Sequence, residues 1–499
     1  MDRRRRTVIG GATALAAGLC LASIASTAPA SANVGWGDDA TSCADGPAGD
    51  LSTLQAWTIN AASGSGTAYL GAGADITGTT SLDIPTTGPV TIDLCGGRVA
   101  ITIPATSDDA GVHVPVGAAL TIADSIGGGT LTVDETAVHY GGAAIGGGLG
   151  EGAGAITIDG GAVTARVGTY SGAAIGGGYG GHGITVTSAG DIPGDGGTGG
   201  DGGTVTVNGG SLTAIATTIY TGAAIGGGFG GFGGLNLMDS SQGAGGDGGD
   251  GGTLVVNGGT VEAIAADALY GATAIGGGSA GFGSRNGTSG AGATVVVNGG
   301  TLLAQSHEVT IGSGVTTRDA DGAPGSLAVA GEWIDGVAPT KPAAISASAA
   351  PAVAPAGGSA RFTITNGTAG GSLTTRIEFV DALTAVAPSA TSAELGDTIT
   401  VTGKAHVPSG ATFDVSSALV LSSDVPEDVV SGNTVTFRHA SPHTITVSYA
   451  GAVTSFTVEV SAPPVLAATG ADPVPWLAAG AVLLLLGAAL VLARRHIRG

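Results

Sequence analysis

The strongest constraint on the fold is a repeat in the middle of the chain. A block of the form apolar-x-apolar-(Asn/Asp)-Gly-Gly-x-apolar-x-Ala occurs at 156–165, 205–214, 254–263 and 295–304. A second motif, Ala-Ala-Ile-Gly-Gly-Gly, alternates with it. Its isoleucines lie 30, 50, 50 and 36 residues apart, the last in a shortened copy: Ile145, Ile175, Ile225, Ile275 and Ile311. Such periods are typical of solenoids, in which each repeat adds one turn to a continuous stack.

Each block has the pattern of two short strands around a tight turn. Apolar and small polar residues alternate on either side of an Asn-Gly or Asp-Gly pair, which favours positive φ. Antiparallel hairpins and a parallel β-helix both fit this pattern. We prefer the β-helix because stacking places Asn208 beside Asn257 and Asn298, whose amides can then form a hydrogen-bonded ladder. In addition, one repeat alone has too few apolar residues to bury a core.

Shorter strand–turn units at 90–97, 119–124 and 129–133 extend this pattern toward the N-terminus. Together the repeats resemble the Gly-rich, right-handed β-helix regions of bacterial surface and carbohydrate-binding proteins. The resemblance covers about 80–315 and implies an all-β fold with a right-handed parallel β-helix, in a repeat domain that we place at 33–320. It implies no particular ligand, because solenoids carry many functions.

Composition excludes several other classes of protein. The chain has 96 Gly among 499 residues, but they do not occur at every third position with the abundant Pro of collagen. The formal net charge is −22, with only 16 Lys and Arg. A nucleic-acid partner requires a basic surface, so we expect no nucleic acid among the partners.

Two Gly- and Asp-rich inserts, 179–203 and 229–252, separate successive repeats. Such insertions often emerge on one face of a solenoid, frequently the binding face. We interpret them as flexible, solvated loops. Residues 245–250 also match the first six positions of the Gly-Gly-x-Gly-x-Asp calcium repeat, without the apolar residue that should follow, so calcium binding is a second interpretation. The candidate ligand oxygens belong to Asp195, Asp201, Asp247 and Asp250.

Aromatic residues form only 4% of the chain, yet one set of tyrosines recurs in register with the repeats. Each lies five residues before a repeat isoleucine: Tyr140, Tyr170, Tyr220 and Tyr270. A ladder of exposed rings would stack on the faces of sugars, whereas an internal ladder would stabilise successive coils. We prefer the internal ladder because Tyr is often half-buried, and we keep ligand stacking as the alternative.

The first 32 residues, 1–32, have the organisation of an export signal. Arg3–Arg6 form a basic segment, an apolar stretch follows, and Ala30–Ala32 supplies the small residues for cleavage before Asn33. The run Arg-Arg-Thr-Val-Ile at 5–9 also resembles a twin-arginine signal. The general and the twin-arginine export routes therefore both remain open.

The other end contains a short motif, an apolar segment and a basic tail. The motif lies in the linker 462–475, residues 476–493 are long and apolar enough to predict a transmembrane helix, and 494–499 is a basic cytoplasmic tail. This order resembles the cell-wall sorting signal of Gram-positive surface proteins, in its L-A-x-T-G variant. The resemblance implies that a sortase cleaves between the Thr and the Gly and joins the chain to peptidoglycan. The motif consists of Leu466, Ala467, Ala468, Thr469 and Gly470. A plain membrane anchor is the alternative.

Removal of both ends would leave 33–469, with nine Lys and Arg against 36 Asp and Glu and a net charge of −27. Such a surface repels nucleic acid and anionic lipid. The remaining cysteines are Cys43 and Cys95. An oxidising exterior permits a disulfide between them, and the sequence leaves their pairing open.

Composition changes after the repeats. Residues 321–385 are rich in Pro and Ala and predict a linker with short strands. Residues 386–461 contain regular short strands between turns, which predicts a small sandwich. The ending of this segment, from Val447 to Val460, resembles bacterial Ig-like stalk modules.

The sequence contains no H-E-x-x-H, C-x-x-C or G-x-S-x-G motif. We therefore expect an exported, cell-wall-anchored surface protein without enzymatic activity. Its β-helix would be adhesin-like or carbohydrate-binding, with an extracellular glycan or a ligand on a host or neighbouring cell as partner and no cofactor other than calcium. The alternatives are a wall-displayed β-helix polysaccharide lyase or hydrolase, and a passive structural coat.

Overall fold

The computed structural model describes most of the chain between Ser42 and Pro463 and part of the C-terminal segment. The described residues are 42–43, 49–64, 66–105, 107–137, 140–217, 220–265, 272–314, 322–335, 353–355, 359–369, 372–463, 479–488 and 490. The predicted signal 1–32, the motif 466–470 and Tyr270 lie outside them.

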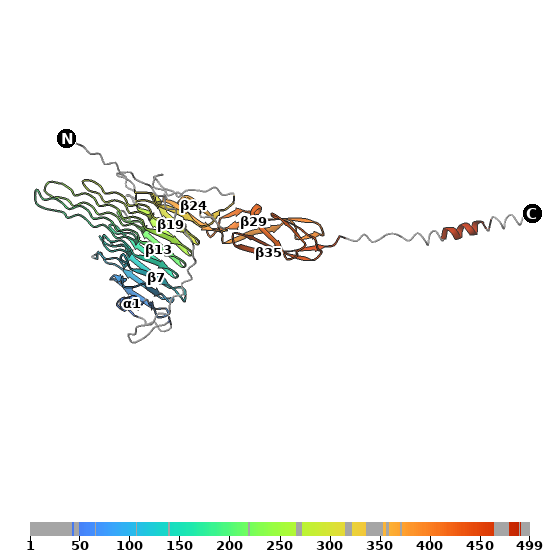
Figure 1. Ribbon diagram of the computed structural model, residues 1–499, viewed down its shortest axis with the longest axis horizontal. Coiled ribbons are helices and arrows are strands. Elements are labelled where there is room, and N and C mark those ends of the chain that lie inside the picture. Colours follow the sequence, from blue (N-terminus) through green and yellow to red (C-terminus); the bar gives the residue numbers. More distant parts are fainter. Residues whose placement is uncertain are drawn as a thin grey trace, which may run out of the picture.

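Three sheets wind around one apolar core, and each coil contributes one strand to each sheet (Figure 1). The first sheet is parallel throughout and contains β1 (Thr67–Tyr69), β4 (Val90–Asp93), β7 (Ala119–Ala123), β10 (Ala155–Ile158), β13 (Thr204–Val207), β16 (Thr253–Val256), β19 (Thr294–Val297), β22 (Ser326–Val329) and β24 (Val353–Pro355). The second sheet begins with β2 (Asp75–Gly78), β5 (Arg98–Thr102), β8 (Thr130–Glu135), β11 (Ala162–Val167), β14 (Ser211–Ala216), β17 (Thr260–Ala265) and β20 (Thr301–Ser306). The third sheet contains β3 (Leu82–Asp83), β6 (Val112–His113), β9 (Ile145–Gly146), β12 (Ile175–Gly176), β15 (Ile225–Gly226), β18 (Thr273–Gly276) and β21 (Val309–Gly312).

The predicted β-helix is confirmed as an all-β solenoid with long parallel sheets, and the hairpin interpretation is wrong. The repeated blocks pair in register from coil to coil, so that Val205 lies beside Leu254. Asn257 donates its side-chain amide to the side-chain oxygen of Asn208 at 2.7 Å, and Asn298 donates to Asn257 at the same distance. This ladder ends at the carboxylate of Asp159, which accepts from Asn208. Parallel stacking is favoured over antiparallel hairpins because it places residues of the same type beside one another in successive coils.

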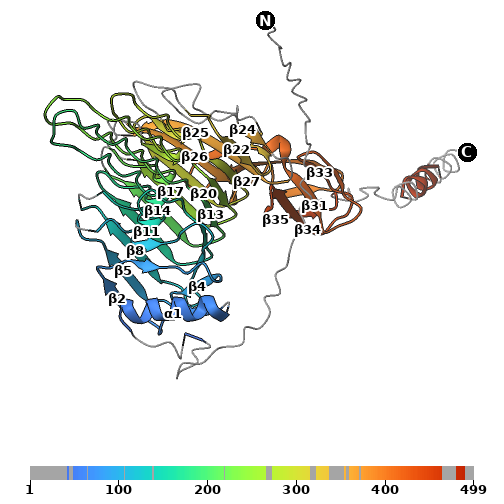
Figure 2. The same cartoon turned by 60° about the vertical axis from the view of Figure 1, so that its left-hand side comes forward.

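A helix closes the N-terminal end of the solenoid, and the repeats did not predict it. This helix, α1 (Leu51–Gly64), packs against β1 and β4 and buries Leu51 and Leu54 in the solenoid core (Figure 2). Asp50 caps it by accepting a hydrogen bond from the Thr53 amide at 2.9 Å. Hydrogen bonds from Ser52 and Thr53 lower the pKa of Asp50 to about 2. The helix covers apolar residues that an open coil would expose to water.

The segment 321–385, predicted as a linker with short strands, contains strands that pair with the solenoid. Two long strands, β25 (Arg361–Ala369) and β26 (Ser372–Phe379), extend the second sheet, with β26 antiparallel to β20. The short β23 (Glu332–Trp333) pairs with β25. Phe362 and Ile377 are fully buried in the solenoid core. This hairpin covers the C-terminal end of the stack, as α1 covers the other end.

Two further sheets form a separate core after the solenoid. One contains β27 (Ala382–Pro388), β29 (Thr398–His406), β30 (Thr412–Asp414), β32 (Val429–Ser431) and β33 (Thr434–Thr436). The other contains β28 (Ser392–Glu394), β31 (Val420–Ser423), β34 (Pro442–Tyr449) and β35 (Ala452–Ser461), and a 3₁₀ turn, η1 (Ser416–Ala418), precedes β31. Ile399, Val447 and Phe437 are among the residues buried between them. The predicted sandwich over 386–461 is therefore present, with its first strand beginning at Ala382.

Within the span predicted at 476–493, the described residues 479–488 and 490 are helical. Among the described residues, no helix reaches the length and apolar character that crossing a bilayer requires. Near the N-terminal end of the solenoid, a disulfide joins Cys43 and Cys95, whose Cα atoms are 5.5 Å apart. It ties the segment before α1 to the turn after β4.

Candidate binding surface

The two Gly- and Asp-rich inserts, with a third from the next coil, form a layered structure that projects away from the sandwich (Figures 1 and 2). After the third sheet of a coil, the chain leaves the solenoid along an outgoing arm and comes back along a returning arm. The outgoing arms are 177–183, 227–234 and 277–283, and the returning arms are 194–203, 243–252 and 287–293.

Hydrogen bonds with a period of three residues join neighbouring arms. The amides of Gly177, Gly180 and Gly183 donate at 2.7–2.9 Å to the carbonyls of Gly226, Phe229 and Phe232, which lie at the start of the next outgoing arm and along it. The same period joins the returning arms, through the amides of Gly196, Gly199, Gly202, Gly245, Gly248 and Gly251. A period of three is the signature of a polyproline II-type helix, which has three residues per turn and no internal hydrogen bonds. The prediction of flexible loops is therefore wrong, because neighbouring arms satisfy the backbone groups that an isolated loop would leave to water.

Glycine makes this packing sterically feasible. The layer of outgoing arms bonds to the layer of returning arms, for example from the Gly228 amide to the Gly200 carbonyl at 2.8 Å. A Cβ on Gly228 would overlap the carbonyl of Gly178 in the preceding arm. The crowding resembles that of the collagen axis, where only Gly fits. In each Gly-Gly-x triplet the two glycines face other arms. The side chain of the third residue points away from the two layers of arms, and we call such residues outward.

The outward residues of the outgoing arms are mostly aromatic, and they pack against the tyrosine ladder. Tyr179 and Phe229 are fully buried, with near-parallel rings 6.1 Å apart. Burial raises the pKa of the Tyr179 hydroxyl and lowers the pKa of the His182 imidazole, so that both are neutral at pH 7.

The structure brings together three of the four predicted tyrosines. The rings of Tyr170 and Tyr220 stack at 5.4 Å with an angle of 8° between their planes, and Tyr140 lies 5.1 Å from Tyr170. The backbones of Tyr170 and Tyr220 have φ near +58°, a conformation that is rare for bulky residues. Tyr170 is also 5.9 Å from Phe232. The three rings thus stack on one another and against the aromatic residues of the arms; Tyr170 and Tyr220 are half-buried, and Tyr140, 46% exposed, has the most accessible surface.

The outward residues of the returning arms are polar and include all four predicted acidic residues. Asp201 accepts a hydrogen bond from the Asp250 amide at 2.9 Å, and Asp250 accepts one from Ala291 at 2.8 Å. Asp195 and Asp247 accept the Ala244 and Thr288 amides in the same way. In each case one carboxylate oxygen accepts a hydrogen bond from a backbone amide of the next arm, and this bond fixes the side chain. The other carboxylate oxygen takes no part in that bond.

A shallow, open depression of about 470 Å³ lies over this acidic face. Thr198, Asp201, Asp247, Asp250 and Thr288 line it together with backbone from the glycines between them. These groups are hydrogen-bond acceptors, or hydroxyls that both donate and accept. Their positions are set by the lattice of hydrogen-bonded arms beneath them. Such a surface can bind a ligand rich in hydroxyl groups or a hydrated cation.

The acidic face does not by itself assemble a tight metal site. Among the residues that the structure describes, one group of three candidate ligands is close enough to share an ion, namely Cys43, Asp93 and Cys95. The two cysteines of that group are joined in the disulfide, so their sulfurs are not thiolates. The four calcium candidates on the returning arms lie along an extended face instead of converging on one point.

Sequence reasoning missed the lattice because it tested the periods of strands and helices. The signal that identifies it is the Gly-Gly-x triplet, as in Gly-Gly-Phe-Gly-Gly-Phe at 227–232 and Gly-Gly-Asp-Gly-Gly-Asp at 245–250. No protein-family model and no curated protein matches this sequence. The function therefore has to be inferred from the chemistry of these faces.

Proposed function

We propose that this chain is an exported, cell-wall-anchored surface protein whose solenoid binds an extracellular carbohydrate on the acidic face of the returning arms. The N-terminal segment 1–32 supports export, and the Leu-Ala-Ala-Thr-Gly motif with the following apolar segment supports anchoring. In this proposal the precursor crosses the membrane at 476–493 before a sortase cleaves it. The two-sheet sandwich acts as an Ig-like stalk, and the solenoid is right-handed, as parallel crossovers nearly always are.

The observation that carries the binding proposal is the array of fixed acceptors on the returning arms. Sugar hydroxyls donate well to carboxylates, and a hydrogen bond to a charged group contributes about 1.5–3 kcal/mol. Because the lattice already holds Asp201, Asp247 and Asp250, little conformational entropy is lost when a ligand binds. The face also repeats from coil to coil, which suits a polymer with a repeating unit.

Substitution of the acidic array is expected to abolish glycan binding without unfolding the protein. The combined change of Asp201, Asp247 and Asp250 to Asn keeps an oxygen that can accept the amide of the next arm but removes the charge. We expect at least about a tenfold loss of retention on a glycan array, with an unchanged melting temperature. Running the array with and without calcium tests whether the ion contributes.

Two controls make this experiment decisive. Asp108→Asn with Asp109→Asn removes two exposed carboxylates from the solenoid body and should leave binding intact. Tyr140→Ala removes the most exposed ring of the ladder. Loss of binding in the tyrosine variant, with normal binding in the acidic variant, would move the carbohydrate site to the aromatic ladder. Turnover of a polysaccharide by the unmodified protein would favour the lyase or hydrolase alternative.

Anchoring has an independent test in cell fractionation. If a sortase joins the cleaved chain to peptidoglycan, muramidase treatment should release the mature protein with the wall fragments. Replacement of Thr469 by Ala should block this release, because the motif would lack the threonine side chain by which a sortase recognises the residue whose carbonyl it attacks. Recovery of the unmodified protein in the membrane fraction would contradict sortase anchoring and support a plain membrane anchor.

A further inference from the structure

The ends of the arms have a fixed shape. Coils are numbered here by their strand in the third sheet, so that β12 belongs to the fourth coil and β15 to the fifth. The arms that follow these two strands have their ends at 184–193 and 235–242. Asn236 is fully buried between them and donates to the carbonyls of Ser188 at 3.1 Å and Asp191 at 2.8 Å. The amide of Leu237 donates to the Val186 carbonyl at 3.0 Å. These bonds hold the two loops to each other, so the surface they present is defined.

This defined surface is unusually apolar for an exposed loop. Ile184, Ile192, Leu237 and Met238 are 73%, 90%, 60% and 66% exposed. Leu235 is also exposed. Single exposed apolar residues are ordinary, but a group of them gathered on two adjoining loops marks an interaction site.

Charge is distributed unevenly across the arm ends. Asp191 is exposed in the fourth-coil loop, directly before Ile192 in sequence. Arg285 is exposed in the sixth coil, which follows the two apolar loops along the stack, and is the only Lys or Arg between 167 and 317. It forms no ion pair among the described residues. Asp239, in the middle coil, turns back to accept the Ser241 amide at 2.9 Å.

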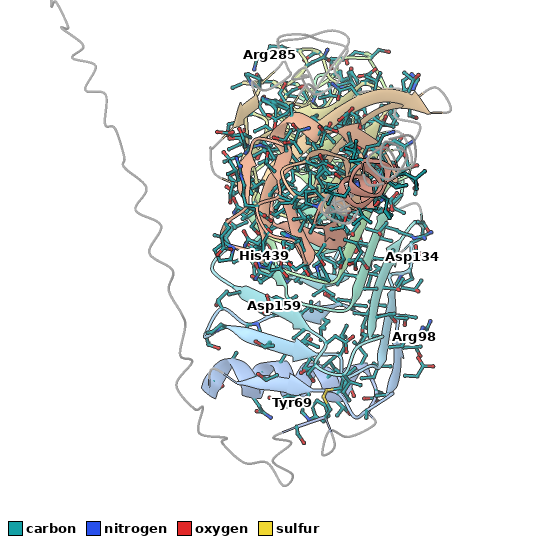
Figure 3. The ribbon with its side chains drawn as sticks, turned by 90° about the vertical axis from the view of Figure 1, so that its right-hand side faces the viewer. Tyr69, Arg98, Asp134, Asp159, Arg285 and His439 are labelled. Carbon is teal, nitrogen blue, oxygen red and sulfur yellow. A yellow bond between two sulfur atoms is a disulfide. The ribbon has the colours of Figure 1, made fainter. Side chains whose placement is uncertain are left out.

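The arm ends also form a step. The end of the sixth coil spans only 284–286, where Ser284 donates to the Gly243 carbonyl near the base of the fifth-coil loop. The fourth- and fifth-coil loops therefore extend beyond the sixth. Figure 3 shows Arg285 at the edge of the molecule, far from Arg98. Acid, apolar residues and base thus follow one another along the coils, with the base on the lower part of the step.

We propose that the arm ends form a two-fold, tip-to-tip interface with a second copy of this chain. If the two-fold axis is perpendicular to the stack of coils, it inverts their order, so the protruding fourth-coil loop of one copy fits the recessed sixth-coil end of the other. Arg285 then faces Asp191 of the partner subunit, and the same pair forms again across the axis. The apolar loops of the two fifth coils meet in the centre, which gives an apolar core with a charged rim.

This proposal does not depend on carbohydrate binding, because it uses the arm ends and not the acidic face. If the chain is anchored at its C-terminus, the arms project on the side away from the sandwich (Figure 1). Two copies on neighbouring cells would then be placed to meet through their arm ends. The interaction would join like surfaces without any other ligand.

The test is the oligomeric state of the chain from 33 to 463, measured by sedimentation velocity as a function of concentration. All the described core residues lie between Cys43 and Val460, so this chain keeps both cores. We expect a reversible dimer that Leu237→Asp converts to monomer. Arg285→Asp and Asp191→Arg each place like charges across the interface and should weaken the dimer about tenfold or more. The combined swap restores the pairing with reversed sign and should recover the original affinity.

A charge reversal far from the arm ends, Arg98→Asp, is the matched control and should leave the dimer unchanged. A monomer at every concentration up to about 100 μM would overturn the proposal. A dimer that none of the arm-end variants weakens, or a combined swap no better than either single change, would also overturn it. Binding of a monomeric chain to phosphatidylcholine vesicles, lost in Leu237→Asp, would overturn it in favour of a lipid surface.

Discussion

Replacement of Gly228 by Ala is expected to lower the free energy of unfolding of the solenoid by about 3 kcal/mol. The new methyl group would overlap the Gly178 carbonyl, which is backbone and cannot turn aside as a long side chain can. The Gly228 amide also donates to Gly200, so moving this arm breaks a bond between the two layers. The strain therefore spreads to several arms, and we expect the glycan-binding and dimer-forming surfaces to be disrupted together.

Gly190→Ala is the matched control for this change. Gly190 lies in the preceding insert, 179–203, with φ of +84° and has open space where a Cβ would project. Its replacement carries only the cost of a left-handed backbone conformation, about 1 kcal/mol. Thermal unfolding followed by circular dichroism compares the two variants. Equal and small losses of stability would show that the arms are not packed through their glycines.

Removal of the Asp428 carboxylate is expected to destabilise the sandwich by about 1–3 kcal/mol, because it leaves a buried imidazole nitrogen without its hydrogen-bond partner. The side chains of His443 and Asp428 are both shielded from solvent, with Nδ1 of the imidazole 2.6 Å from a carboxylate oxygen. The other ring nitrogen, Nε2, lies 2.8 Å from the His439 carbonyl. Both nitrogens thus lie within hydrogen-bond distance of an oxygen. Asp428→Ala would remove the partner of Nδ1 and leave that atom buried.

The same pair makes the stability of the sandwich depend on pH. Burial raises the pKa of Asp428, but hydrogen bonds from Ser423, the Arg438 amide and His443 outweigh it, and the net pKa is lowered. A carboxyl whose pKa is lower in the folded state contributes stability above its unfolded pKa, near 3.8, and loses it as the pH falls further. The difference between the unmodified protein and Asp428→Ala should therefore be largest at neutral pH and shrink toward pH 2.

Calorimetry at several pH values can measure both effects, with Asp414→Ala as control. Asp414 lies on the same sandwich and also has a lowered pKa, through hydrogen bonds from Ser416, but it is fully exposed. Water can replace its partners, so its removal should change the unfolding temperature little. An Asp428 variant that unfolds like the Asp414 variant at neutral pH would show that the buried imidazole does not depend on its carboxylate partner.

Local pattern was sufficient to predict the coils. The apolar residues of each block, such as Val205 and Leu212, alternate with small polar residues, and they are the residues that the solenoid buries. The shortened repeat at Ile311 proved to be a true rung, because its strand pairs with that of Ile275. A repeat predicts stacking reliably because every copy has too few apolar residues to form a core alone, and every copy completes its core against its neighbours.

The ends of the solenoid could not be predicted in this way. Neither α1 nor the hairpin of β25 and β26 belongs to the repeat, and their roles depend on the open coil that each one covers. Leu54 in the helix and Phe362 in the hairpin are buried only because a stack terminates beside them. Nothing in the local sequence of these segments specifies that neighbour.

The sequence alone thus determined that this chain stacks, which residues face the core and where the asparagine ladder lies, because these properties repeat at every coil. The tertiary structure alone decided the state of the glycine-rich inserts. One Gly-Gly-x segment is entropically expensive to order and makes no hydrogen bonds within itself. Only when the solenoid holds several such arms side by side do their amides find acceptors, and then the absence of side chains permits close packing. The acidic face and the apolar arm ends therefore exist only as products of the assembled stack.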